Sequence, residues 1–111
     1  MSPSDGIRIG HMLEAAREAL ALAAGSQRSG LDHDRKLVPA VIKCVEIVGE
    51  AASKTSAEFR TQNPQIPWAE IVGMRNRLIH VYFDIDLDRV WDTITDDLPQ
   101  LIAKLEKLPT E

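Results

Sequence analysis

Apolar residues recur at helical spacing along the first part of the chain. Separations of three, four and seven residues put one set on a single helix face: Ile9, Met12, Leu13, Ala16, Leu20 and Ala23. The pattern predicts a helix from near Asp5 to Gly25, because glycine tolerates the left-handed conformation that ends helices. The next segment, GSQRSGLDHD at residues 25–34, is rich in Gly, Ser and Asp and is typical of a surface loop.

A second apolar stripe predicts a helix that begins at about Asp34. Its members lie at nearly heptad spacing: Val38, Val41, Ile42, Val45, Val48, Gly49 and Ala52. Pro39 fits this helix only in the first turn, where its missing N–H breaks no hydrogen bond. Gly49 and Ala52 are small, so we expect another helix to approach closely there.

The segment RTQNPQIP, residues 60–67, predicts the next break, and Pro67 suits the first position of a third helix. That helix is expected to end near His80, because FDIDLD at residues 83–88 alternates apolar and acidic residues. This stretch offers three candidate caps for the following helix, namely Asp84, Asp86 and Asp88.

A fourth helix is predicted by the longest stripe: Leu87, Val90, Trp91, Ile94, Leu98, Leu101, Ile102 and Leu105. Pro99 lies inside this stripe, so we expect a kink or a short break near Asp97. Four helices with short connections favour an all-α, antiparallel up-and-down four-helix bundle. The length of 111 residues fits one domain spanning 1–111.

Composition and charge restrict the class of protein. Apolar residues make up 44% and charged residues 27%, as in ordinary soluble globular proteins. The longest apolar run, Ala19–Ala24, is far too short to cross a bilayer and no targeting segment is evident, so a cytoplasmic location without membrane contact is expected. The lone Cys44 is expected to be buried, and it offers no metal-ligand pair. The net charge of −4 argues against general coating of nucleic acid but permits a local basic site.

The segment GMRNRLIHVYFDID, residues 73–86, concentrates the chemistry of the chain. His80 is suited to proton exchange near neutral pH, and Arg75, five residues earlier, is a permanent fork-shaped cation suited to phosphate. RNA cleavage by transesterification needs a base for the 2′-hydroxyl proton, an acid for the leaving oxygen and a cation for charge on phosphorus. Arg75 and His80 are therefore candidate catalytic residues, although such a pair also occurs on ordinary solvated helix faces.

Two features complicate a site made by one chain. Five residues of an ideal helix leave two side chains roughly 140° apart, so either Arg75 curls back or the helix ends near His80. One His80 also cannot be base and acid at once, and neither His11 nor His33 has a comparable setting. A symmetric dimer would bring two sets of residues to one cleft.

Three longer segments resemble the HepT-like family of HEPN-domain proteins. They are EIVGEAA at residues 46–52, IPWAEIVGMRNRLIHVYFDID at 66–86 and VWDTITDDLPQLIAKLE at 90–106. The resemblance implies an all-helical HEPN fold, a homodimer, and the role of toxin in a type VII-like bacterial toxin–antitoxin pair. The family motif of Arg, four residues, His, any residue and Tyr is met by Arg75, His80 and Tyr82.

The same resemblance implies a mechanism and a partner. In the family this motif forms a metal-independent endoribonuclease site at the dimer interface, so RNA, either tRNA or mRNA, is the expected substrate and no cofactor is expected. The expected partner is an MntA-like nucleotidyltransferase antitoxin that attaches AMP to Tyr82. Added phosphate beside His80 and Arg75 would compete with RNA for the cation.

Other residues and another function remain open. Asn76 either supports the site, by binding RNA or orienting His80, or satisfies nearby backbone. Glu50 resembles a polar family position near the cleft, but it and Glu46 are also placed for ordinary surface ion pairs. Asp84 begins an acidic alternation that lacks the remaining ligands of an EF-hand, so no metal site is expected. The alternative function is a non-catalytic helical module that binds or completes a nucleotidyltransferase, which the acidic net charge favours.

Overall fold

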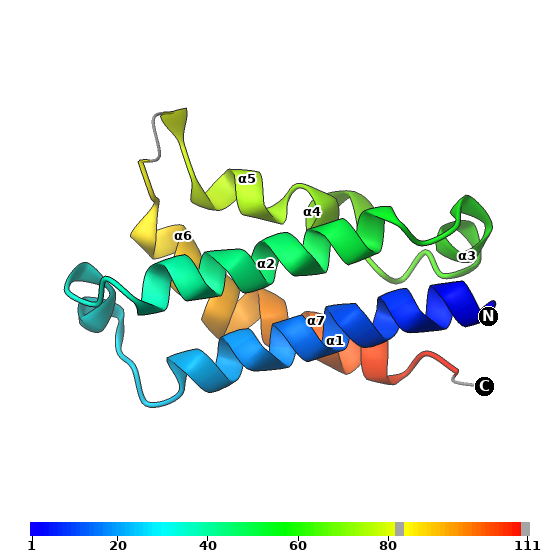
Figure 1. Cartoon of the computed structure of the whole chain (residues 1–111), viewed down its shortest axis with the longest axis horizontal. Coiled ribbons are helices and arrows are strands. Elements are labelled where there is room, and N and C mark those ends of the chain that lie inside the picture. The colour runs from blue at the N-terminus through cyan, green and yellow to red at the C-terminus, as the bar shows by residue number, and fades with distance from the viewer. Residues whose placement is uncertain (82–83, 110–111) are drawn as a thin grey trace.

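The chain folds into helices that form four antiparallel rods. The computed structural model describes residues 1–81 and 84–109. The elements are α1 (Pro3–Ala23), η1 (Arg28–Asp32), α2 (Leu37–Ser53), α3 (Ala57–Gln62), α4 (Trp68–Val72), α5 (Met74–Leu78), α6 (Leu87–Asp92), η3 (Thr93–Asp97) and α7 (Leu98–Glu106). The rods are α1, α2, α4 with α5, and the continuous run α6–η3–α7, and they alternate in direction (Figure 1). The predicted all-α up-and-down bundle is confirmed.

The start of α1 is fixed by a buried carboxylate. Asp5 is only 4% exposed, and its side chain accepts hydrogen bonds from the Ser2 hydroxyl at 3.0 Å and from the Ser56 N–H and hydroxyl, both at 2.8 Å. Burial is the largest influence on the pKa of Asp5 and acts to raise it, but the hydrogen bonds from Ser56 and Ser2 outweigh it, and the pKa lies below its ordinary value. Because Ser56 is the N-cap of α3, this carboxylate ties the beginnings of two helices together.

The helix α2 is the centre of the bundle and packs closely on α4. A Cβ atom at Gly49 would lie 3.2 Å from the carbonyl oxygen of Ile71 and 3.4 Å from that of Val72. The predicted close approach at Gly49 is therefore confirmed. Pro39 lies in the first turn of α2, as predicted, and Asp34 caps this turn by accepting hydrogen bonds from two backbone N–H groups.

Two connections contain short helices that the apolar pattern did not predict. The segment 25–34, expected to be a loop, contains η1, whose Leu31 is buried. The helix α3 overlaps the first residues of the break expected at 60–67. Ser56 caps the start of this helix by accepting a hydrogen bond from the N–H of Phe59 at 3.1 Å. The Phe59 ring is buried and packs edge-on against Trp68, with ring centroids 5.9 Å apart.

The third and fourth rods are interrupted. The third is divided at Gly73, a residue with low helix propensity, so α4 and α5 are each five residues long. In the fourth rod, the N–H of Leu98 donates to the carbonyl oxygen of Thr93, which makes η3 a π-helical turn just before Pro99. A proline ring clashes with the carbonyl four residues earlier in a regular α-helix, and the wider turn relieves this crowding. The structure has this π-helical turn near Asp97 in place of the predicted kink or short break, and the helix continues directly into α7.

The core lies between α1, α2 and the two interrupted rods. Its fully buried side chains include Met12, Val41, Val45, Leu78 and Leu98. The lone Cys44 is buried, as predicted, and burial together with the nearby Glu18 raises the pKa of its thiol. Within residues 1–81 and 84–109, no helix is both long enough and apolar enough to span a membrane.

Candidate active site

The segment between α5 and α6, residues 79–86, is here called the His80 loop, and its described residues, 79–81 and 84–86, stand out from the bundle (Figure 1). The helix α5 ends at Leu78, and Ile79 has extended backbone angles and forms an antiparallel bridge with Ile85. The N–H of Asp86 donates to the Leu78 carbonyl at 2.8 Å, and that of His80 donates to the Asp84 carbonyl at 2.7 Å. These bonds close the base of the loop. Tyr82 lies outside the described residues.

The His80 side chain is accessible and faces a carboxylate that is fixed in place. It is 56% exposed, and its Nε2 atom lies 3.4 Å from Oδ2 of Asp86. The other oxygen, Oδ1, accepts a hydrogen bond from the N–H of Arg89 at 3.0 Å and so caps α6. The Arg89 N–H and then the His80 side chain lower the pKa of Asp86. An ionised carboxylate held in this way favours one orientation of the imidazole.

The three aspartates predicted as caps have different roles. Asp86 is the N-cap of α6, as predicted. The prediction is wrong for Asp88, whose side chain pairs with Arg28 of η1 at 2.7 Å. Asp84 contributes its backbone carbonyl to the His80 loop. Among the described residues, Asp86 is the aspartate whose carboxylate faces His80, because residues 84, 86 and 88 lie at different places on a turning chain.

Arg75 lies on α5 and leans toward α2. Its Nε atom is 3.7 Å from Oε2 of Glu46, and its Nη1 atom donates to the side-chain oxygen of Asn76 at 3.5 Å. The Arg75 side chain is 38% exposed, so the guanidinium remains open to solvent. The other Glu46 oxygen binds Lys43 at 3.0 Å, and Lys43 first and Arg75 second lower the pKa of Glu46.

The structure brings together only part of the predicted set. Arg75 contacts Asn76, but in the described parts of the chain no hydrogen bond or ion pair joins Arg75 to His80. Glu50 pairs with Lys54 at 3.2 Å, one helical turn beyond Glu46. Glu46, rather than Glu50, therefore contacts the arginine.

The sequence pattern did not reveal Glu46 and Asp86 as the side-chain partners of Arg75 and His80. Glu46 was placed for an ordinary surface ion pair, but no spacing within one helix reveals a contact between α2 and α5. The signal for Asp86 was its place before α6, which predicted a cap and not a partner for His80. Over the described ranges, no three His, Cys, Asp or Glu side chains are grouped to hold a metal ion.

Comparisons with known proteins match most of the chain, including the segment that carries this site. The family described as Ribonuclease HepT-like matches residues 12–108. A probable ribonuclease HepT of Thermococcus cleftensis is 44% identical over 75 residues, which are 68% of each chain. A protein of Methanocaldococcus jannaschii, named as a candidate RNase, is 34% identical over 95 residues, 86% of this chain and 87% of that one. No solved structure shows a significant match. The chain belongs to the HepT-like family of ribonucleases.

Proposed function

We propose that this chain is a metal-independent endoribonuclease toxin that cleaves tRNA or mRNA at a site containing Arg75 and His80. The observation that carries the proposal is the exposed His80 imidazole, held 3.4 Å from Asp86 at the end of the helix that carries Arg75. Membership of the HepT-like family supports the same chemistry. Asn76, through its contact with Arg75, is a supporting residue, and Glu46 has a stronger geometric claim than Glu50.

The proposed reaction uses the RNA as its own nucleophile. A base removes the proton of a ribose 2′-hydroxyl, and the 2′-oxygen bonds to the adjacent phosphorus. The bond from phosphorus to the 5′-oxygen breaks, an acid protonates this leaving oxygen, and a 2′,3′-cyclic phosphate remains. His80 acts in proton transfer, and Arg75 stabilises the charge that develops on the phosphoryl oxygens. Asp86 orients His80.

A homodimer completes this mechanism. One chain supplies one histidine in the motif, whereas the reaction requires a base and an acid. Within one chain, Arg75 leans toward Glu46 of α2 and His80 toward Asp86 at the start of α6. Two copies related by a twofold axis would place both sets of side chains around one RNA phosphate.

The first test is cleavage of total cellular RNA by the purified chain in EDTA, compared with an Arg75→Gln variant. We expect the native chain to cleave under chelation and Arg75→Gln to be about 10²- to 10³-fold slower, because the transition state loses its cation. Arg77→Gln is the matched control, since it removes the same charge from the same short helix. Cleavage that requires a divalent metal, or equal rates for the native chain and Arg75→Gln, would overturn the mechanism. Absence of cleavage by the native chain would favour the non-catalytic module.

We further propose that a MntA-like nucleotidyltransferase antitoxin neutralises the toxin by modifying Tyr82. The tyrosine oxygen would bond to the α-phosphorus of ATP, pyrophosphate would leave, and the phenolic proton would pass to solvent or to a base of the partner. Tyr82 follows His80 by two positions, so the attached phosphate would add negative charge near the proton-transfer group. This charge would repel an RNA phosphate and compete for Arg75.

Tyr82→Phe should prevent the modification, because phenylalanine has no oxygen to accept AMP. The expected result is no mass increase of the intact chain after incubation with the partner and ATP, whereas the native chain gains one AMP. The variant should also remain toxic when the partner is present. Labelling of the Phe variant to the same extent as the native chain would exclude Tyr82 as the acceptor.

A further inference from the structure

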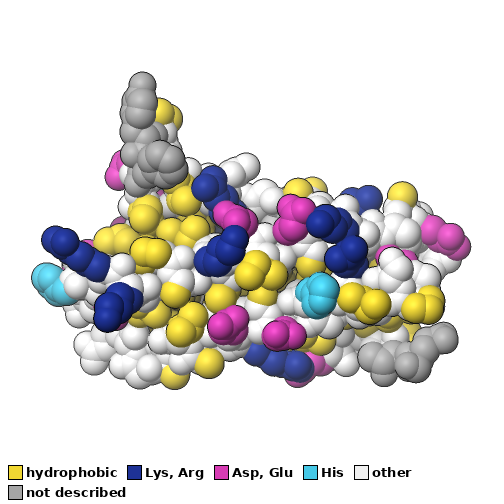
Figure 2. Space-filling view, in the orientation of Figure 1, with side chains coloured by type: hydrophobic (Ala, Val, Ile, Leu, Met, Phe, Trp, Pro, Cys, Tyr) yellow, Lys and Arg dark blue, Asp and Glu magenta, His cyan; other side chains and the backbone are white. Residues whose placement is uncertain are grey.

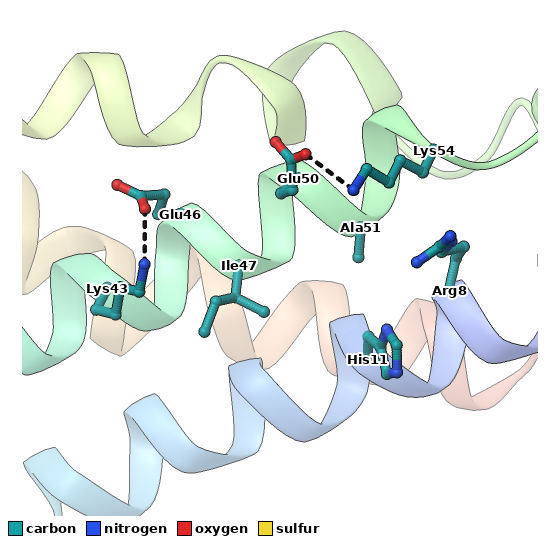
Figure 3. A pocket seen from close by; sticks show the side chains of 8 residues that line it. All are labelled: Arg8, His11, Lys43, Glu46, Ile47, Glu50, Ala51 and Lys54. Atoms are coloured by element: carbon teal, nitrogen blue, oxygen red, sulfur yellow. Dashed lines mark hydrogen bonds and ion pairs between the residues drawn. The ribbon is translucent and has the colours of Figure 1, made fainter.

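A shallow groove of about 290 Å³ runs between α1 and α2, and here it is called the α1–α2 groove (Figure 3). Its ionisable lining consists of Arg8, His11, Lys43, Glu46, Glu50 and Lys54. On the same face of the molecule, charged side chains of both signs gather along α2 and its junction with α1 (Figure 2). The proposed reaction involves none of four of these residues: Arg8, His11, Lys43 and Lys54.

The groove is locally basic in an acidic protein. It contains three permanent cations and two carboxylates, so its charge is +1 with His11 neutral, whereas the whole chain carries −4. Arg8 makes no ion pair or hydrogen bond among the residues that the structure describes. Figure 3 shows Arg8 and His11 on α1, opposite the charged pairs of α2. An arginine without a carboxylate partner is available to an external anion.

The two lysines of the groove are also available. Lys43 is 67% exposed and pairs with Glu46 at 3.0 Å, and Lys54 is 51% exposed and pairs with Glu50 at 3.2 Å. Exposed ion pairs of this kind contribute little to stability, so a phosphate can replace the carboxylate with little loss. The groove thus offers three cations to a polyanion.

The groove is continuous with the proposed active site through Glu46. This carboxylate lines the groove, binds Lys43 and lies 3.7 Å from Nε of Arg75. Lys54, the C-cap of α2, follows Glu46 by eight residues, which is about 12 Å along the helix axis. A stacked strand advances about 3.4 Å per nucleotide, so this length accommodates about three nucleotides.

We propose that the α1–α2 groove binds backbone phosphates of the RNA strand whose scissile phosphate lies at Arg75. Arg8, Lys43 and Lys54 hold the strand by its charge and not by its bases. The inference rests on the proposed function, because it places the groove beside the site where that function occurs. These three residues would bind the substrate and take no part in the chemical step.

The test measures RNA binding in a His80→Ala background, which leaves the RNA uncut. The probe is end-labelled total cellular RNA, retained on filters with the protein over a series of salt concentrations. Adding Arg8→Gln with Lys54→Gln should weaken binding about tenfold and reduce the slope of log affinity against log salt by about 0.7 for each lost phosphate contact. The matched control is Arg17→Gln with Lys107→Gln, which removes the same types of charge outside the groove and should bind as the parent does.

The outcomes separate the two proposals. If the groove variant and the control bind RNA equally, the groove proposal is overturned, while EDTA-resistant cleavage by the native chain still supports the proposed function. If the native chain neither binds nor cleaves RNA, both proposals fail. Thermal unfolding and sedimentation of each variant are measured alongside. A groove variant that folds but changes its oligomeric state would assign the groove to contact between copies, and this would also overturn RNA binding there.

Discussion

His80→Ala should lower the rate of RNA cleavage by about 10²- to 10⁴-fold and leave the fold intact. The rate falls because a positioned acid or base contributes about this factor to proton transfer. The fold is retained because the side chain is 56% exposed and its hydrogen-bond partner, Asp86, still caps α6. The measurement is cleavage of total cellular RNA in EDTA, with protein prepared identically for both chains.

His33→Ala is the control for this prediction. His33 is an exposed histidine that follows η1, and it lies outside the His80 loop. We expect native cleavage from His33→Ala and, in cells, growth inhibition by this variant but not by His80→Ala. Cleavage and growth inhibition that persist in His80→Ala would reject a catalytic role for His80. A loss shared equally by both histidine variants would indicate damage unrelated to the site.

Asp5→Ala should reduce the free energy of unfolding by about 2–4 kcal/mol at neutral pH. The substitution leaves the Ser56 N–H without its acceptor and removes a charged group that also receives hydrogen bonds from two hydroxyls. The measurement is urea-induced unfolding followed by circular dichroism. Glu58→Ala is the control, because this carboxylate is exposed in α3, the helix whose N-cap Ser56 binds Asp5, and should change stability by no more than about 0.5 kcal/mol.

The effect of Asp5→Ala should also depend on pH. The pKa of Asp5 is lower in the folded chain than its ordinary value of 3.8, so the ionised carboxylate stabilises the fold at pH values above 3.8. This contribution is lost as the pH falls through the folded-state pKa. The difference between the native chain and Asp5→Ala should therefore narrow below pH 3.8. A difference that is constant from neutral to acidic pH would contradict the role of the ionised form.

The apolar pattern predicted the helices that are long enough for their buried residues to repeat at helical spacing several times. The helices α1 and α2 have 21 and 17 residues, and their predicted faces lie in the core. The helix α3 has six residues, too few for a repeating pattern, and it depends on the Ser56 cap and on the packing of Phe59. The division of the third rod at Gly73 also depends on packing that local propensity does not specify.

The sequence suggested residues for the candidate site but not the contacts between them. The alternation at residues 83–88 predicted a helix end near His80, and α5 ends two residues earlier, at Leu78, so ideal helical spacing does not constrain His80. The contact of Arg75 with Glu46 joins two rods that are distant in sequence. Such contacts depend on the rotation of each rod about its axis, which a hydrophobic stripe determines only approximately.

The two oxygens of Asp86 have a consequence for the interpretation of mutants. Oδ1 caps α6 and Oδ2 faces His80, so one side chain serves both the integrity of a helix and the orientation of the proposed catalytic group. If a variant at Asp86 lost activity, the loss could come from a weakened α6, from a misoriented His80, or from both. A loss of stability in such a variant would therefore not argue against a role of Asp86 in the reaction. Fraying of the first turn of α6 would likewise release the imidazole from its partner while the rest of the bundle stays folded. Heat inactivation can therefore precede unfolding.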